Sequence, residues 1–219
     1  MYQRYAIYFV PDGPWGDFGA QWLGWDSRTG QAHAAHAHSD WTMRPRNYGF
    51  HATLKAPFRM ADGCHVDQLT EKVIQIATSH EAIALRSLGL EKIGPFFALT
   101  APEEHLQIRV LADDLVQLTD MFRAPLTSEE LAKRRQSRLS ALQEENLQNW
   151  GYPNVLDAYQ FHVTLTGRVK DPDTVRAVLA NAFDAPQQHP LTLSDVCVMG
   201  EDANGQFHVI DRIGLTGGR

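Results

Sequence analysis

The sequence predicts an α+β fold of two lobes related by a pseudo-twofold axis, each with a mainly antiparallel sheet and helices, with a cleft between them. The first observation is a repeated heptad: residues 48–54 read YGFHATL and residues 159–165 read YQFHVTL. The second is that each copy precedes the pattern of one helix and then two strands. The chain has 219 residues, enough to bury a substantial core. We therefore expect one bilobal domain whose repeated halves are about 1–101 and 102–219.

The first half should begin with a strand, because residues 5–10 are β-branched and aromatic and are followed by turn residues. Aromatic residues at spacings of three or four then predict a helix over 15–25, and we interpret its apolar face as core: Trp15, Phe18, Trp22 and Trp25. Residues 26–47 lack a clear period and are expected to form a long loop. The heptad strand should end near Pro57, because proline lacks a ladder donor. A helix over 66–80 and strands over 82–93 and 96–100 complete this half.

The second half carries three local signals. A capping box begins at Thr127 and opens a helix, Asp171 is the N-cap of another helix, and Asn204-Gly205 predicts a hairpin turn. The elements expected here are a strand over 106–111, helices over 112–122 and 128–150, the second heptad strand, a helix over 172–183, and strands over 191–199 and 206–213.

Side chains alternate between the two faces of a strand, and this alternation gives each heptad one apolar and one polar face. The polar face carries His51 and Thr53 in the first copy, and His162 and Thr164 in the second. Two such faces opposite each other would form a symmetric polar cleft. We therefore expect two imidazoles and two hydroxyls around one small ligand.

The composition is that of an ordinary globular protein, with 43% hydrophobic and 21% charged residues. No apolar run reaches the roughly 18 residues of a membrane span, and the N-terminus lacks a secretory signal, so we expect a cytoplasmic protein. The net charge of -6 argues against a protein that coats long nucleic acids. Cys64 and Cys197 are too few for a disulfide framework and are expected to behave as small buried hydrophobes.

Three histidines lie close together in the loop over 26–47: His33, His36 and His38. Such a cluster could hold a divalent metal, but Asp40 is the one carboxylate nearby, and His33 and His38 would diverge on either a helix or a strand. A solvated loop is the preferred interpretation. We therefore expect no metal site and no cofactor.

Two histidines presented from opposite sides of a cleft can act as base and acid, since an ordinary imidazole pKa near 6.5 allows one neutral and one protonated ring. Hydroxyls beside them can hold the nonbridging oxygens of a phosphoryl group. No nucleophile elbow, Walker phosphate loop or Gly-x-Gly-x-x-Gly motif occurs. The pattern favours cleavage of a phosphodiester, in particular a cyclic one.

The duplicated His-x-Thr motif, with apolar flanks and about a hundred residues between copies, resembles the 2H phosphoesterase superfamily. Residues 48–58, YGFHATLKAPF, resemble most closely the bacterial branch found beside carbon-phosphorus lyase genes of phosphonate catabolism. The resemblance implies a bilobal fold and metal-independent phosphodiester chemistry, with four residues at its centre: His51, Thr53, His162 and Thr164. Superfamily members open 2',3'-cyclic nucleotides and related cyclic phosphates. A phosphoribosyl cyclic phosphate would be a sensible substrate in a phosphonate pathway.

Other polar residues are candidates for substrate binding. Lys55 and Thr166 continue the polar faces of the two strands, and Arg135 lies among the leucines of the helix over 128–150, from where it could reach a second phosphate. Arg46 and Arg44, just before the first heptad, are similar candidates. By the same alternation Tyr48 and Tyr159 belong to the core, and His208 is expected to be structural.

The expected function is thus a hydrolase that acts on a small phosphorylated metabolite or nucleotide, with no obligate protein partner evident. The sequence leaves open which histidine is the base and whether residues 26–47 or the arginine-rich helix form a lid. A non-catalytic module that binds a phosphate ligand or an RNA end in the same cleft is the alternative. The intact pair of motifs disfavours that alternative, because binding alone needs no acid and base.

Overall fold

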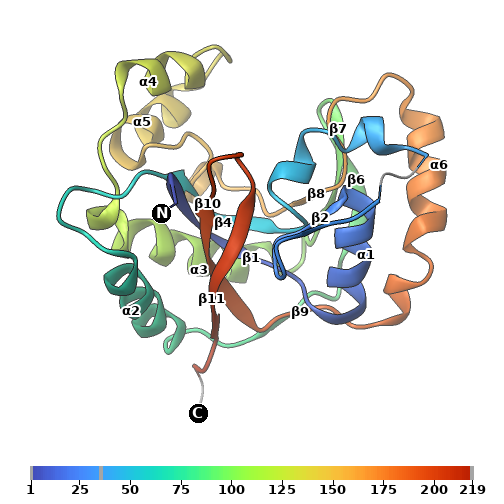
Figure 1. Ribbon diagram of the computed structural model, residues 1–219, viewed down its shortest axis with the longest axis horizontal. Helices are drawn as coiled ribbons and strands as arrows, with labels where there is room; N and C mark the ends of the chain where they lie inside the picture. Colours follow the sequence, from blue (N-terminus) through green and yellow to red (C-terminus); the bar gives the residue numbers. More distant parts are fainter. Residues whose placement is uncertain (1, 35–36, 218–219) are drawn as a thin grey trace.

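The computed structural model describes residues 2–34 and 37–217 and contains one seven-stranded sheet in which all neighbours are antiparallel (Figure 1). The strand order is β11-β10-β1-β4-β8-β7-β6. The strands are β1 (Arg4–Phe9), β4 (Ala52–Phe58), β6 (Gly89–Ile93), β7 (Phe96–Thr100), β8 (Val163–Thr164), β10 (Asp195–Glu201) and β11 (Phe207–Gly214). Short pairs join β2 (Trp25–Asp26) to β3 (Gln31–Ala32) and β5 (Ile83–Ala84) to β9 (Thr192–Leu193).

Six α-helices are described. Two of them, α1 and α6, lie at the end of the molecule on the right of Figure 1, beyond β8. On the other side, α2 and α3 contact each other and the strands β4, β10 and β11. The helices are α1 (Gly13–Leu23), α2 (Val66–Ala77), α3 (His105–Leu118), α4 (Ser128–Arg134), α5 (Ala141–Trp150) and α6 (Pro172–Phe183). Short 3-10 turns are η1 (Ser39–Trp41), η2 (Pro45–Asn47), η3 (Asp120–Phe122), η4 (Leu156–Ala158) and η5 (Pro186–Gln188). The α+β class predicted from the sequence is confirmed.

The two sequence halves do not build separate sheets. The hairpin β6–β7 of the first half pairs with β8 of the second half, whereas the hairpin β10–β11 of the second half pairs with β1 of the first. The repeated order of strand, helix and hairpin is present, as β4, α2, β6–β7 and as β8, α6, β10–β11. One lobe for each half is therefore wrong, because each hairpin completes the sheet around the other half's strands.

The strand predicted over 106–111 is instead part of α3. Its buried side chains follow the helical spacing of three and four residues: Ile108, Leu111, Ala112, Leu115 and Val116. Leu106 and Val110, which suggested alternation, are exposed. The apparent period of two therefore combined these two exposed residues with buried Ile108.

The long helix predicted over 128–150 is two helices. A second capping box begins α5, where the Ser140 hydroxyl accepts a hydrogen bond from the Gln143 amide and the Gln143 side chain accepts one from the Ser140 amide. Residues between Arg134 and Ala141 therefore turn the chain between α4 and α5. The strands predicted over 82–93 and 191–199 are likewise each divided into two.

Helix α1 is fixed to the sheet by its tryptophans. The helix ends at Gly24 in the left-handed conformation, with φ 83°, so Trp25 falls in β2 and not in the helix. The indoles of Trp15, Trp22 and Trp25 donate to the carbonyls of His189, Leu165 and Phe207, respectively. The aromatic stripe is thus core, as predicted, and its polar edges are paired.

Cys197 is fully buried, and burial raises the pKa of its thiol to about 12. Cys64 is half-buried and packs against the main hydrophobic core. Within the described part of the chain, no helix is long and apolar enough to cross a membrane.

Gly19 lets α1 approach the residue before the first catalytic candidate. A Cβ at position 19 would lie 2.0 Å from Cγ of Phe50, which is buried and precedes His51. Gly19→Ala should therefore lower the free energy of unfolding by about 1 to 3 kcal/mol through overpacking, although alanine is the better helix former by about 1 kcal/mol. Denaturant unfolding measures this, and Gln21→Ala at an exposed position of the same helix is the control. A stabilised Gly19→Ala protein would contradict the close packing.

Candidate active site

The two heptads meet in the sheet through one residue pair. Ala52 of β4 lies opposite Val163 of β8, and both are fully buried. Because the strands are antiparallel, the residue before Ala52 lies opposite the residue after Val163, and the reverse. His51 is thus opposite Thr164 and Thr53 is opposite His162, on the sheet face away from the Ala52 and Val163 side chains. Directly opposed side chains have Cβ atoms roughly 4.5 to 5.5 Å apart. The register therefore gathers the four predicted residues into one site.

His51 is held by contacts on both ring nitrogens and on the ring face. Its Nδ1 lies 3.0 Å from the carbonyl oxygen of Gly49, and its Nε2 lies 3.2 Å from Oγ1 of Thr53. The ring stacks on buried Tyr8, with centroids 3.8 Å apart. Gly49 has φ 73°, a conformation that favours glycine. This turn directs its carbonyl to the imidazole two residues later.

His162 is held in a matching way. Its Nδ1 lies 2.8 Å from the carbonyl oxygen of Gln160, again two residues earlier, and its ring centroid lies 5.9 Å from that of Phe96. A carbonyl oxygen can only accept, so Nδ1 carries the hydrogen in both histidines. In each neutral ring Nε2 is therefore the nitrogen that can take a proton. His162 precedes β8 directly, so a two-residue strand is enough to position it.

Burial lowers the pKa of both histidines. The pKa of His51 falls from 6.5 to about 4, mainly because its charged form loses hydration, and a charge on His162 lowers it further. The hydrogen bond to the Gly49 carbonyl opposes this shift. Burial also lowers the pKa of His162, and the Gln160 carbonyl opposes that shift. Since each charge disfavours the other, the pair favours states with at most one proton on the two Nε2 atoms.

Two cavities open on this site. One of about 670 Å³ is lined by His51, Thr53 and Thr164, and another of about 420 Å³ is lined by His162 and Thr53. They share four lining residues: Thr53, Gln143, Tyr152 and Asn154. The four motif residues thus lie where two adjoining cavities meet, and the combined space suits a small ligand.

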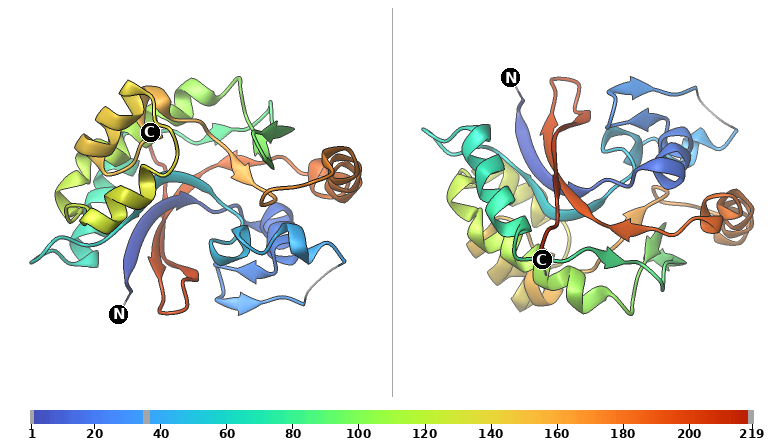
Figure 2. Two further views of the ribbon diagram at one scale, coloured as in Figure 1. Left: turned by 90° about the horizontal axis from the view of Figure 1, so that it is seen from above. Right: turned by 90° about the horizontal axis from the view of Figure 1, so that it is seen from below.

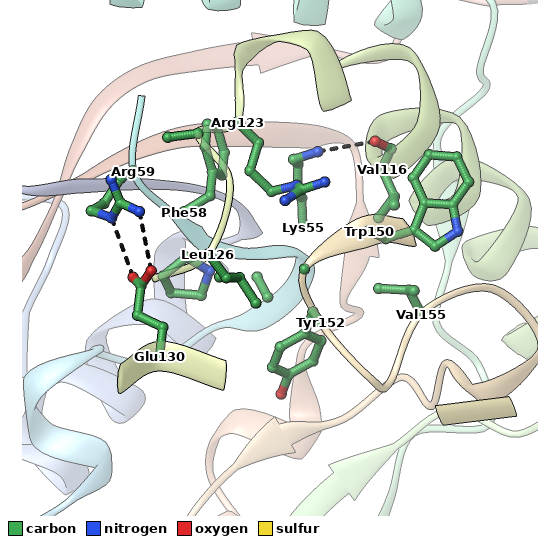
Figure 3. A pocket seen from close by; sticks show the side chains of 14 residues that line it. Lys55, Phe58, Arg59, Val116, Arg123, Leu126, Glu130, Trp150, Tyr152 and Val155 are labelled. Carbon is green, nitrogen blue, oxygen red and sulfur yellow. Dashed lines mark hydrogen bonds and ion pairs between the residues drawn. The ribbon is translucent and has the colours of Figure 1, made fainter. Parts of the chain in front are cut away.

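Lys55 does not line either cavity. It is 3% exposed, and its Nζ donates to the carbonyl of Val116 at 2.9 Å, as Figure 3 shows. The same Nζ lies 3.9 Å from Oδ1 of Asp120. In β4, Thr53 pairs with Tyr8 but Lys55 pairs with Ile7, so Leu54 is the extra residue of a β-bulge. The bulge turns Lys55 to the opposite face, which corrects the assignment made from strict alternation.

The other three predicted binding residues also lie away from the two cavities. Thr166 is buried, and its Oγ1 accepts from the Phe97 amide and donates to the Gly167 carbonyl. Arg135 is exposed and forms an ion pair with Glu144. Arg46 donates to the carbonyl of Leu23. Their substrate-binding roles are therefore not supported, because their donors and hydroxyls are used within the fold.

The larger cavity is lined by Arg44, a candidate from the sequence, and by residues that sequence patterns assigned elsewhere. Tyr48 was expected in the core, but it is 38% exposed and lines this cavity, because the strand begins only at Ala52. Tyr159, in contrast, is buried as predicted, and its hydroxyl donates to the carbonyl of Thr53. Charged and aromatic residues that complete the lining are Arg4, Tyr8, Arg44, Glu130, Lys133, Arg134, Arg138 and Tyr152. The run of basic residues from Lys133 indicated a cationic site in the sequence. Under the prediction of one continuous helix, however, Arg135 and not Arg134 pointed inward.

The described loop histidines and His208 lie outside the two cavities. Of the loop cluster, His36 lies outside the described residues, and the ring of His38 stacks on that of Trp41. Among residues 2–34 and 37–217, no group of three histidine, cysteine, aspartate or glutamate side chains is placed to hold a metal ion. His208 bonds to Asp202 and packs at right angles to Trp25, which agrees with a structural role.

The chain belongs to the family described as "Protein of unknown function (DUF1045)", whose match covers residues 53–208. Similar curated proteins include one called "Ribose 1,5-bisphosphate phosphokinase PhnN" from Janthinobacterium sp. (strain Marseille). It is 34% identical over 227 residues, which cover 92% of this chain and 48% of that protein. A protein of the same name from Laribacter hongkongensis (strain HLHK9) is 29% identical over 198 residues, with 86% and 46% covered. The chain thus spans about half the length of the curated relatives it matches.

Two solved structures resemble the fold over nearly the whole chain. One is described as "Crystal structure of phosphoesterase", with 13% identity, a TM-score of 0.49 and coverage of 98% of this chain and 99% of that one. The other is described as "Crystal structure of E.coli LigT complexed with ATP", with 14% identity, a TM-score of 0.49 and coverage of 98% of both chains.

The buried Lys55 gives a test of the bulge through the pH dependence of stability. Burial lowers its pKa from 10.5 to about 8, so below pH 8 both folded and unfolded chains carry the proton. Between pH 8 and 10.5 the unfolded chain holds the proton and the folded chain has released it, which stabilises the fold as pH rises. Relative to Lys55→Met, the free energy of unfolding of the wild type should rise by up to about 3 kcal/mol over this range.

Urea unfolding at a series of pH values measures this difference. Lys92→Met, at an exposed position, is the matched control and should give a nearly constant difference from the wild type. The same constancy for Lys55→Met would show that Lys55 is hydrated, and it would contradict the inward orientation.

Proposed function

We propose that the protein is a phosphoesterase that opens or hydrolyses a small cyclic or linear phosphodiester by acid-base catalysis with His51 and His162. The observation that carries this proposal is the register of Ala52 opposite Val163, which brings both His-x-Thr motifs to one place. The matching hydrogen bonds from Nδ1 to the carbonyls of Gly49 and Gln160 support it, because they leave both Nε2 atoms for proton transfer.

The proposed reaction has one displacement at phosphorus. Nε2 of His51, neutral because of its lowered pKa, removes a proton from the attacking water as the new P–O bond forms. The bond to the leaving oxygen breaks on the opposite side, and that oxygen takes the proton from Nε2 of His162. As the ligand enters, the Thr53 hydroxyl turns from Nε2 of His51 to a nonbridging oxygen, and the Thr164 hydroxyl donates to another. Proton exchange with solvent then restores the starting state. The two imidazoles supply both proton transfers, so the proposed mechanism needs no metal ion.

The proposed substrate is a cyclic phosphate of a sugar or nucleotide, such as a phosphoribosyl cyclic phosphate or a 2',3'-cyclic nucleotide. The name of the curated relatives supports a phosphorylated ribose, and we propose a role in cytoplasmic phosphonate metabolism. Kinase activity is not proposed for this chain, which spans about half of those relatives and contains no Walker phosphate loop. The net charge of -6 favours a small metabolite over long RNA.

Substitution of either histidine tests the proposed proton transfers. His51→Ala and His162→Ala should each lower kcat for a cyclic phosphodiester by roughly 100-fold or more, because each removes one proton transfer. His189→Ala is the control, since His189 is exposed and lies outside both cavities. The substrates are 2',3'-cyclic nucleotides and ribose cyclic phosphates, with products identified by phosphorus NMR. Stoichiometric binding of these compounds without turnover would instead support the non-catalytic binding module.

A separate test asks whether the activity requires a metal ion. Dialysis against EDTA should leave the rate within about twofold of its starting value if histidines alone transfer the protons. Loss of activity that added zinc restores would contradict the metal-independent mechanism.

The pH profile follows from the two lowered pKa values. The rate should rise with pH as the base loses its proton at about pH 4, and fall as the acid loses its proton below the ordinary value of 6.5. The dependence of kcat/KM on pH, which reports the free enzyme, should therefore peak between about pH 4 and 6.5. A maximum above pH 7.5 would contradict the lowered pKa of at least one of these rings.

A further inference from the structure

The two adjoining cavities differ in charge. The cavity beside His162 contains no lysine, arginine, aspartate or glutamate among its lining residues. The cavity beside His51 contains five of the chain's 20 lysine and arginine residues and one of its 26 acidic residues. In a protein with a net charge of -6, so strong an excess of cations at one end of the site indicates an anionic part of the ligand at that end.

Two of the charges at the His51 end already have partners. The single carboxylate, Glu130, accepts two hydrogen bonds from Arg59, at 3.1 and 3.3 Å, as Figure 3 shows. Arg4 forms an ion pair with Glu201. Glu130 also attracts the charge of Arg134 from a distance, but it forms its ion pair with Arg59.

Four cations lack such a partner. Within the described ranges, no carboxylate forms an ion pair with Arg44, Lys133, Arg134 or Arg138. Arg44 comes from the segment before the first heptad, and the other three come from α4 and the turn that follows it, before the second heptad. Cations from both segments thus converge on one end of the cavity.

Arg134 is the member of this group that packs on an aromatic ring of the site. Its guanidinium lies over the ring of Tyr152, 5.0 Å from the centroid, and Tyr152 lines both cavities. The side chain is half-buried, and this burial lowers its pKa because no carboxylate compensates the charge fully. A half-buried guanidinium with free donors is suited to bind a phosphate with two hydrogen bonds.

We infer that the ligand carries a second phosphate, a monoester distinct from the diester at the histidines, and that Arg134, Lys133, Arg138 and Arg44 bind it. The inference rests on the proposed function and names its substrate class: a cyclic or linear phosphodiester of a sugar that also bears a terminal phosphate. The same asymmetry orients the ligand, with the terminal phosphate beside His51 and an uncharged group in the cavity beside His162.

The test compares substrates that differ by one phosphate. The pairs are ribose 1,2-cyclic phosphate with and without a 5-phosphate, and adenosine 2',3'-cyclic phosphate with and without a 5'-phosphate. For at least one pair, kcat/KM should be roughly 10- to 100-fold higher for the phosphorylated member, which is the range of charge-assisted hydrogen bonds. This preference should weaken in high salt, because the cations lie at an open cavity.

Two variants connect the preference to the named residues. Arg134→Gln should remove most of the preference, so that kcat/KM for the two members of a pair differs by less than about threefold. Arg138→Gln should reduce the preference by itself, and it covers the case in which Arg134→Gln fails to fold. Arg135→Gln is the matched control, because it removes the same charge one position later from an exposed residue outside the cavity.

The outcomes separate the two proposals. If both members of every pair are turned over equally, or if Arg135→Gln has the same effect as Arg134→Gln, the phosphate site is overturned and the phosphoesterase function stands. If no compound is turned over, the proposed function fails. Calorimetry with the same pairs then tests the phosphate site by itself. Tenfold tighter binding of the phosphorylated member, lost in Arg134→Gln, would still support the site, whereas equal affinities would overturn it.

Discussion

The single pairing of Ala52 with Val163 is the constraint on which the site depends. It is a short contact, since β8 has two residues, and it is stabilised by its neighbours: β1 pairs with β4 on one side and β7 pairs with β8 on the other. Because each hairpin belongs to the other sequence half, neither half can complete the sheet around its own motif. The exchange of hairpins therefore couples the folding of the whole chain to the geometry of four side chains.

The central residues could be predicted because alternation on a strand is a local rule, and both copies obey it from the histidine to the threonine. The rule failed one step later, at Lys55, because a bulge at Leu54 depends on the pairing with β1 and has no clear local signal. Arg135 was predicted inward because α4 and α5 appeared continuous, although Ser140 and Gln143 form a capping box that could have indicated the break. The exchange of hairpins between halves could not be predicted, since identical local order is compatible with either arrangement.

The candidate site has a part without fixed charge at the two motifs and a cationic part beside it. Around the two motifs, burial lowers the pKa of both imidazoles and disfavours their charged forms, and the threonines carry no charge. The cations lie to one side, on α4, in the turn after it and before the first heptad, and Tyr152, which packs under Arg134, lines the same cavity as His51. Such a division would let charge select and orient the ligand while proton transfer proceeds between two weakly basic rings.

We propose that both histidines contact one phosphoryl group. Nitrogen NMR of the two imidazoles during titration with inorganic phosphate tests it most directly, with His51→Ala and His162→Ala to assign the signals. If both rings contact one phosphate, both have their hydrogen on Nδ1 at pH 7, and both Nε2 signals shift together with one dissociation constant. Shifts of one ring alone, or of the two rings with clearly different constants, would contradict a shared site.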